Sequence, residues 1–140
     1  MKRFLSPLSC VLLVSILCCG VANAVDIRSS DYFRSYDGSI STGSSSGELS
    51  LQFSASARSS MKSLGISSIA VYTSGGSRVK TISGSTSSGL LAASTSFHSG
   101  TYTITNLTPG QEYYLSLTFV AKDSYGGDSK PFTTNTATAK

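Results

Sequence analysis

Apolar and polar residues alternate along two stretches of this chain. Between residues 48 and 58, and again between residues 113 and 122, apolar side chains occupy every odd-numbered position and mostly polar ones lie between them. This alternation places the apolar side chains on one face of a strand, whereas a helix needs apolar residues three and four positions apart. Both stretches therefore predict half-buried strands, and strands with one apolar face build the core of a sandwich.

Shorter segments extend the pattern. Runs rich in β-branched and aromatic residues predict further strands at residues 38–42, 68–72, 78–82, 101–105 and 132–136. Ser and Gly dominate the expected loops at 43–47 and 83–89. Leu90 and Leu91 follow the second loop and are expected either to enter the core or to form an exposed contact patch. Pro131 precedes the last strand, which suits an edge position where no backbone donor is required. About seven antiparallel strands make an all-β sandwich the expected fold class.

The first 24 residues have the pattern of an export signal. Lys2 and Arg3 precede an apolar run at 11–17 that is too short to span a bilayer, and an Ala-Asn-Ala triplet ends at Ala24. Signal peptidases cut after such small-x-small triplets. We therefore expect cleavage between Ala24 and Val25, a secreted domain at 25–140, and no membrane attachment after cleavage.

The same residues allow two alternatives to a cleavable signal. One is a buried N-terminal helix, against which both the order of charges and the cleavage triplet speak. The other is a lipoprotein, since Cys18 and Cys19 follow the apolar run. The residues just ahead of Cys18 are not the small ones that lipid attachment requires, so the cleavable signal is preferred.

Removal of the signal changes the composition of the domain. All three cysteines (Cys10, Cys18 and Cys19) lie in the signal, so the mature domain is expected to have neither a disulfide nor a thiolate metal site. Nine Lys and Arg then remain against seven Asp and Glu, a net charge of +2, and they are scattered singly. This pattern does not suggest binding to nucleic acid. A chain of this length supports one domain.

A motif in the last third of the chain carries a family resemblance. Leu107-x-Pro109-Gly110-x-x-Tyr113, followed by the alternating strand and a Gly-bearing hairpin at 123–127, resembles the fibronectin type III domain. The resemblance implies an immunoglobulin-like, fibronectin type III-like sandwich over residues 25–140. It also implies a tyrosine corner, in which the Tyr113 hydroxyl bonds to the backbone of the preceding loop and Leu107 caps the core.

The resemblance is incomplete in the earlier part of the chain. The chain has no Trp, although type III domains usually bury one on an early strand, and Phe53 is expected to fill that space. The layout near the mature start, from Ser30 to Phe33, also resembles small secreted proteins of Gram-positive gut bacteria. That second resemblance implies no activity.

Few side chains offer catalytic or metal chemistry. His98 is the single histidine, and it is expected at a turn rather than beside a nucleophile. Glu48 should point to solvent and Glu112 should lie in the corner loop, which does not favour a glycosidase pair. Asp123 and Asp128 flank the last hairpin, where ordinary turn chemistry explains them better than Ca²⁺ binding. We therefore expect no enzyme, no cofactor and no bound metal.

Binding is the remaining class of function. We expect a secreted, monomeric binding or adhesion module whose partner is an extracellular protein or glycan. The alternatives are a structural subunit of a surface assembly joined by strand exchange and, last, a secreted hydrolase. Aromatic residues are the candidate contacts, either as a contact surface or as simple cover for the sandwich ends: Tyr32, Phe33, Tyr36, Tyr72 and Tyr125.

Overall fold

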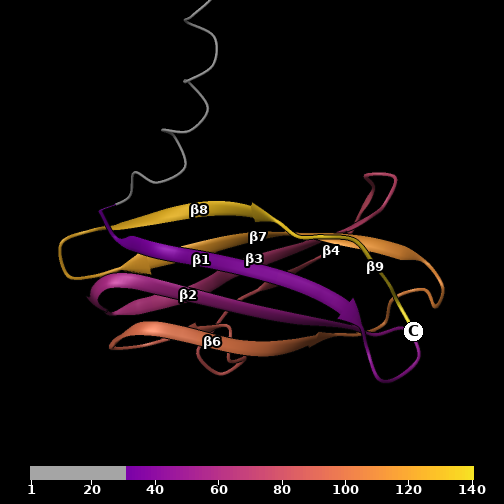
Figure 1. The fold of residues 1–140 in the computed structure, drawn as a ribbon, viewed down its shortest axis with the longest axis horizontal. Coiled ribbons are helices and arrows are strands. Elements are labelled where there is room, and N and C mark those ends of the chain that lie inside the picture. Colours follow the sequence, from indigo (N-terminus) through magenta and orange to yellow (C-terminus); the bar gives the residue numbers. More distant parts are fainter. Residues whose placement is uncertain (1–30) are drawn as a thin grey trace, which may run out of the picture.

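The computed structural model describes residues 31–140, so the predicted signal and its cleavage site at Ala24 and Val25 lie outside the described residues. The described part contains strands and no helix, and hence no helix that could cross a membrane. Figure 1 shows two layers of strands lying face to face. The strands are β1 (Phe33–Thr42), β2 (Leu49–Met61), β3 (Ser63–Thr73), β4 (Arg78–Ser83), β5 (Leu91–Ala92), β6 (Thr95–Ile104), β7 (Glu112–Lys122), β8 (Gly127–Thr133) and β9 (Ala137–Thr138).

The strands form two antiparallel sheets. The first sheet has the order β1-β2-β6, and the second has the order β4-β3-β7-β8. The short β5 pairs with the start of β3, on the side of β3 that faces away from β7, and β9 pairs with the start of β7. The chain passes twice from the first sheet to the second, and β6 returns to pair with β2. The predicted all-β sandwich is confirmed.

The core lies between the sheets and follows the predicted alternation. The odd-numbered positions of β2 from 49 to 57 and of β7 from 113 to 121 are all buried. β3 adds Ile69 and Val71 from the middle of the second sheet, both without exposed surface. Phe53 is buried in this core, as is Leu90, whereas Leu91 is half-buried in β5. Full burial of one apolar side chain such as Phe53 or Leu90 stabilises the fold by about 1.5–3 kcal/mol.

Two predictions about strand limits are wrong. β6 begins at Thr95 rather than 101, so His98 lies within a strand and not at a turn. β8 spans 127–133, so Pro131 lies inside this strand instead of preceding a strand at 132–136. β2 supplies hydrogen-bonding partners to the Ser- and Gly-rich start of β6, which has little strand signal of its own. Pro131 is tolerated because β8 pairs only with β7 and is an edge strand.

The segment after β8 joins the two sheets along one side. The carboxamide of Asn135 accepts a hydrogen bond from the Ile40 N–H and donates one to the Ile40 carbonyl, each at 2.9 Å. The side chain thereby imitates a strand partner for β1. Thr134 is buried, but its hydroxyl accepts a hydrogen bond from the Leu115 N–H at 3.0 Å. Ala139 is 2% exposed, so this segment belongs to the folded unit.

Candidate functional site

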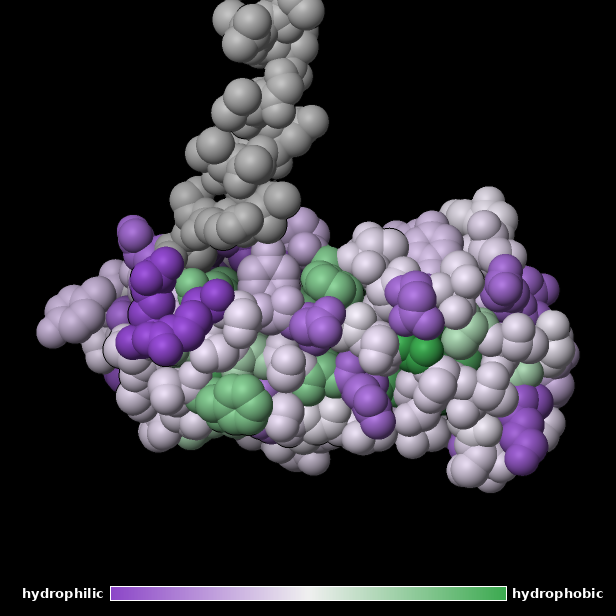
Figure 2. Space-filling model, viewed as in Figure 1, coloured by the Kyte–Doolittle hydropathy of each residue, from purple (hydrophilic) through white to green (hydrophobic). Residues whose placement is uncertain are grey.

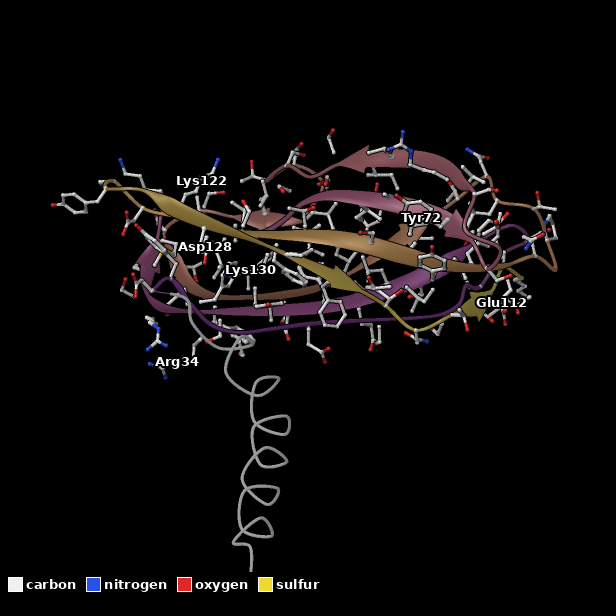
Figure 3. The ribbon with its side chains drawn as sticks, turned by 90° about the horizontal axis from the view of Figure 1, so that it is seen from above. Arg34, Tyr72, Glu112, Lys122, Asp128 and Lys130 are labelled. Atoms are coloured by element: carbon white, nitrogen blue, oxygen red, sulfur yellow. The ribbon has the colours of Figure 1, made fainter. Side chains whose placement is uncertain are left out.

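The predicted contact aromatics do not form one surface. Tyr72 pairs with Tyr114 near the start of β7, whereas Tyr125 follows the end of β7. Tyr72 and Tyr125 therefore lie toward opposite ends of the sandwich. Figure 3 shows the same separation, with Tyr72 and Glu112 toward one end and Lys122 toward the other.

The three aromatics near the start of β1 are part of the core or pack against it. Phe33 is 3% exposed, and its ring lies 5.2 Å from that of Tyr36. The Tyr36 ring lies in turn 5.3 Å from Phe119, in the middle of the core. Tyr32 is half-buried and packs against the same cluster. Phe33 is therefore wrong as a contact residue, because the sandwich covers it, and Tyr36 and Tyr32 act mainly as cover for the core.

Tyr72 and Tyr114 form a stacked pair on the outer face of the second sheet. Their ring centroids lie 5.3 Å apart with planes 8° from parallel. Both side chains are half-buried, yet neither belongs to the core, whose residues on β3 and β7 alternate with them. The pair is thus a stacked aromatic feature on the outer face of the second sheet. The sequence does contain a signal for Tyr114. It occupies an even-numbered position of an alternating strand, where a polar residue is expected, so its aromatic ring is predicted to face outward.

An exposed arginine extends this row. Arg78 lies opposite Tyr72 in the β3–β4 pairing, whereas the preceding pair is Val71 with Lys80. The shift leaves Val79 as an extra residue, a β-bulge that turns Arg78 to the outer face and Lys80 to the inner one. Lys80 Nζ donates a hydrogen bond to the Thr105 carbonyl at 2.9 Å. No pattern in the sequence locates such a bulge, so the neighbourhood of Arg78 and Tyr72 was not predicted.

Tyr125 is held at the tip of the β7–β8 hairpin and is 95% exposed. Asp123 Oδ1 accepts hydrogen bonds from the N–H groups of Tyr125 and Gly126, at 2.7 and 3.0 Å. Asp128 forms an ion pair with Lys130 at 3.4 Å. Asp123 therefore fixes the turn through its carboxylate. Among the described residues, no three His, Cys, Asp or Glu side chains are grouped so as to hold a metal ion.

The loop between β6 and β7 contains a tyrosine corner. The Thr108 N–H donates a hydrogen bond of 2.9 Å to Tyr113 Oη, and Tyr113 is 3% exposed. Leu107 is 8% exposed and closes the core from the loop. Gly110, at φ +83°, allows the chain to turn back into β7 after Pro109. Leu107, Gly110 and Tyr113 thus shape this loop and close the core beneath it.

His98 links β6 to the loop before β5. Its Nε2 lies 2.7 Å from the Gly89 carbonyl oxygen, and its ring meets Phe53 edge-on at 5.4 Å. Glu48 accepts a hydrogen bond from the Ser45 N–H at 3.2 Å, within its own loop. Glu112 is exposed at the start of β7. The hydrogen bonds of His98 and Glu48 are with backbone groups of nearby loops.

The outer face of the first sheet is rich in hydroxyl groups. Strand pairing aligns Ser39, Gln52 and Thr101 in one row, and Asp37, Ser54 and Ser99 in the next. Figure 2 shows this face as pale over most of its area, which reflects residues of intermediate hydropathy. A shallow hollow of about 230 Å³ on this face is lined by Asp37, Ser39, Gln52, Phe53 and Ser54.

A second hollow, of about 240 Å³, lies between β4 and the tyrosine-corner loop and is lined by Val79, Lys80, Asn106, Leu107, Thr108 and Tyr113. Both hollows are open to solvent.

No protein-family model matches the chain, and no curated protein or solved structure matches it significantly.

Proposed function

We propose that this protein is an exported, non-catalytic binding or adhesion module of the fibronectin type III-like kind. The tyrosine corner and the Greek-key return of β6 to β2 support the kinship with that family. Such sandwiches bind through a sheet face or through the loops at one end. The partner is an extracellular protein or glycan.

One observation carries the proposal: the row formed by Arg78, Tyr72 and Tyr114 on the outer face of the second sheet. Tyr and Arg are the residue types that, with Trp, most often dominate binding energy. The stacking of the two rings fixes them before a partner arrives, so little side-chain entropy is lost on binding. Strands position all three residues, which gives a more rigid site than a loop would.

The chemistry of this row sets the kind of partner. Tyrosine rings offer apolar surface together with a hydroxyl that donates and accepts hydrogen bonds. Arg78 is exposed and offers a planar, charged donor to a carboxylate, sulfate or phosphate. The row therefore fits a partner that combines apolar patches with acidic groups, as an acidic glycan or an acidic protein surface does.

A binding panel tests this proposal. Purified protein is titrated against peptidoglycan, mucin, plant polysaccharides and whole bacterial cells, with binding measured by depletion from solution. We expect saturable binding to at least one acidic surface, weakened by salt because Arg78 takes part. Absence of binding to every surface would contradict an adhesion role for these ligand classes.

A further inference from the structure

Among residues 31–140, β6 is the long edge strand that carries neither a charged residue nor a proline, and the backbone groups of Phe97, which bond to Thr95 Oγ1, are the ones on its open side that already have a partner. β4 carries Arg78, Lys80 and a bulge, and β8 carries Pro131. The edge of β1 is occupied by the Asn135 carboxamide. Bulges, charged residues and proline are the usual means by which sheet edges avoid association.

The ten residues of β6 include neither a proline nor an Asp, Glu, Lys or Arg. They are rich in residues that favour strands, namely Thr, Phe, Tyr and Ile. β6 pairs with β2 on one side only, so its other side is the end of the first sheet. A strand of this length and composition at a sheet edge is a template for a further strand.

One contact shows which backbone groups of β6 face the open side. The Phe97 N–H donates to Thr95 Oγ1 at 3.2 Å, and the same hydroxyl donates to the Phe97 carbonyl at 2.8 Å. Both backbone groups of Phe97 therefore point away from β2. Alternation along an antiparallel strand then places the N–H and C=O groups of Ser99, Thr101 and Thr103 on that open side.

We propose that β6 pairs antiparallel with β6 of a second copy of this chain, with the two-fold axis at Gly100. In this register Ser99 lies opposite Thr101 of the partner subunit, and each pair exchanges two backbone hydrogen bonds. The two Gly100 residues meet at a non-hydrogen-bonded pair, where the strands approach most closely and where a side chain would be most crowded. The first sheets of both copies become one continuous sheet.

The same register covers side chains that the monomer leaves exposed. Phe97 is 57% exposed on the outer face, and it comes to lie opposite Thr103 of the partner subunit. An aromatic side chain beside a β-branched one is a favourable cross-strand pair. On the inner face, the half-buried His98 lies opposite Tyr102 of the partner subunit. No like charges meet, because β6 carries none of the charged residue types. Each of these cross-strand pairs forms twice in the symmetric register, and this self-complementarity favours a second copy as the partner.

Sedimentation equilibrium of the full-length purified protein over a wide concentration range tests the pairing. We expect reversible dimers. The double variant Ser99→Lys/Thr101→Lys places like charges opposite each other at both crossings and should raise the dimer Kd tenfold or more. Ser99→Glu/Thr101→Lys carries as many charged residues but places opposite charges together, and should keep the Kd within about threefold of the unmodified protein. Ser39→Lys/Ser41→Lys, on the opposite edge strand of the same sheet, is the matched charge control and should leave dimers intact.

A protein that stays monomeric at every concentration overturns the inference. Dimers that survive Ser99→Lys/Thr101→Lys also overturn it, because they must use another surface. Equal loss of dimers in both charged variants of β6 overturns the register at Gly100. If the unfolding midpoints of the variants equal that of the unmodified protein, these substitutions of exposed residues have not disturbed the fold. The inference is independent of the proposed function, because the Arg78–Tyr72–Tyr114 row lies on the other sheet. The binding panel tests that row, whereas sedimentation tests the pairing of β6.

Discussion

At the scale of single residues, the aromatic side chains divide between structural and outward-facing roles. Tyr113 is buried and fixes the loop ahead of β7 through its hydroxyl. Tyr72 and Tyr114 leave the core and stack on the outer face of the second sheet. Successive side chains of a strand point to opposite faces. Whether a tyrosine occupies an odd- or an even-numbered position in its strand therefore decides between these roles.

Replacement of Tyr113 by Phe tests the structural role. The change removes the acceptor of the Thr108 N–H while the ring stays in place. We expect the free energy of unfolding in urea to fall by about 1 kcal/mol, the usual net value of one hydrogen bond. Tyr102→Phe is the control, because Tyr102 packs half-buried against the core and its hydroxyl has no hydrogen bond in the described part of the chain. Equal losses in both variants would show that the Tyr113 hydroxyl has no special role.

At the scale of elements, the sandwich is closed differently on its two sides. On one side, Asn135 bonds to β1 and β9 pairs with β7, so the segment after β8 ties the two sheets together. On the other side, the Lys80 amine bonds to the carbonyl after β6, and His98 bonds to the Gly89 loop. Side chains help to bridge both gaps, because within residues 31–140 no strand of the first sheet pairs with a strand of the second.

Replacement of Asn135 by Ala removes both hydrogen bonds to Ile40. We expect a loss of about 2 kcal/mol in the free energy of unfolding, at roughly 1 kcal/mol for each bond. In hydrogen exchange, the replacement should accelerate exchange of the Ile40 amide more than exchange of amides in β7. Thr136→Ala, at the exposed neighbouring position, should change neither quantity. Unchanged protection of Ile40 in Asn135→Ala would refute the bridging role.

The strands that could be predicted are those with two regular faces. β2 and β7 alternate almost without interruption, and the structure confirms their limits to within a few residues. The early part of β6 escaped prediction because Ser, Gly and His carry no strand signal until β2 supplies a ladder. The position of Arg78 beside Tyr72 depends on a bulge, and that bulge arises from pairing between strands rather than from local sequence.

At the scale of the whole molecule, the interior is almost entirely apolar and the chemistry lies on the surface. Thr134 is the only buried polar or charged residue in the described part of the chain, and its hydroxyl is hydrogen-bonded. On the face drawn in Figure 2, hydrophilic residues and residues of intermediate hydropathy cover most of the surface. The proposed function therefore depends on a surface feature, the row of Arg78, Tyr72 and Tyr114.

Export adds a prediction at the same scale. Intact-mass measurement and N-terminal sequencing of the protein recovered from its producing cells should show a chain that begins at Val25, because the Ala-Asn-Ala triplet ends at Ala24. A chain that retains Lys2 and Arg3 would contradict cleavage. A diacylglycerol mass on Cys18 or Cys19 would establish the lipoprotein alternative instead.

Binding isotherms on the surface that the purified protein binds best test directly whether the Tyr72–Tyr114 pair makes the contact. The double variant Tyr72→Ser/Tyr114→Ser removes both rings from the outer face of the second sheet, and Tyr125→Ser removes an equally aromatic, more exposed ring from the opposite end. We predict that the double variant loses affinity by tenfold or more, at an unchanged far-ultraviolet circular dichroism spectrum, while Tyr125→Ser binds as the unmodified protein does. Equal isotherms for all three proteins, or a loss confined to Tyr125→Ser, would contradict the account.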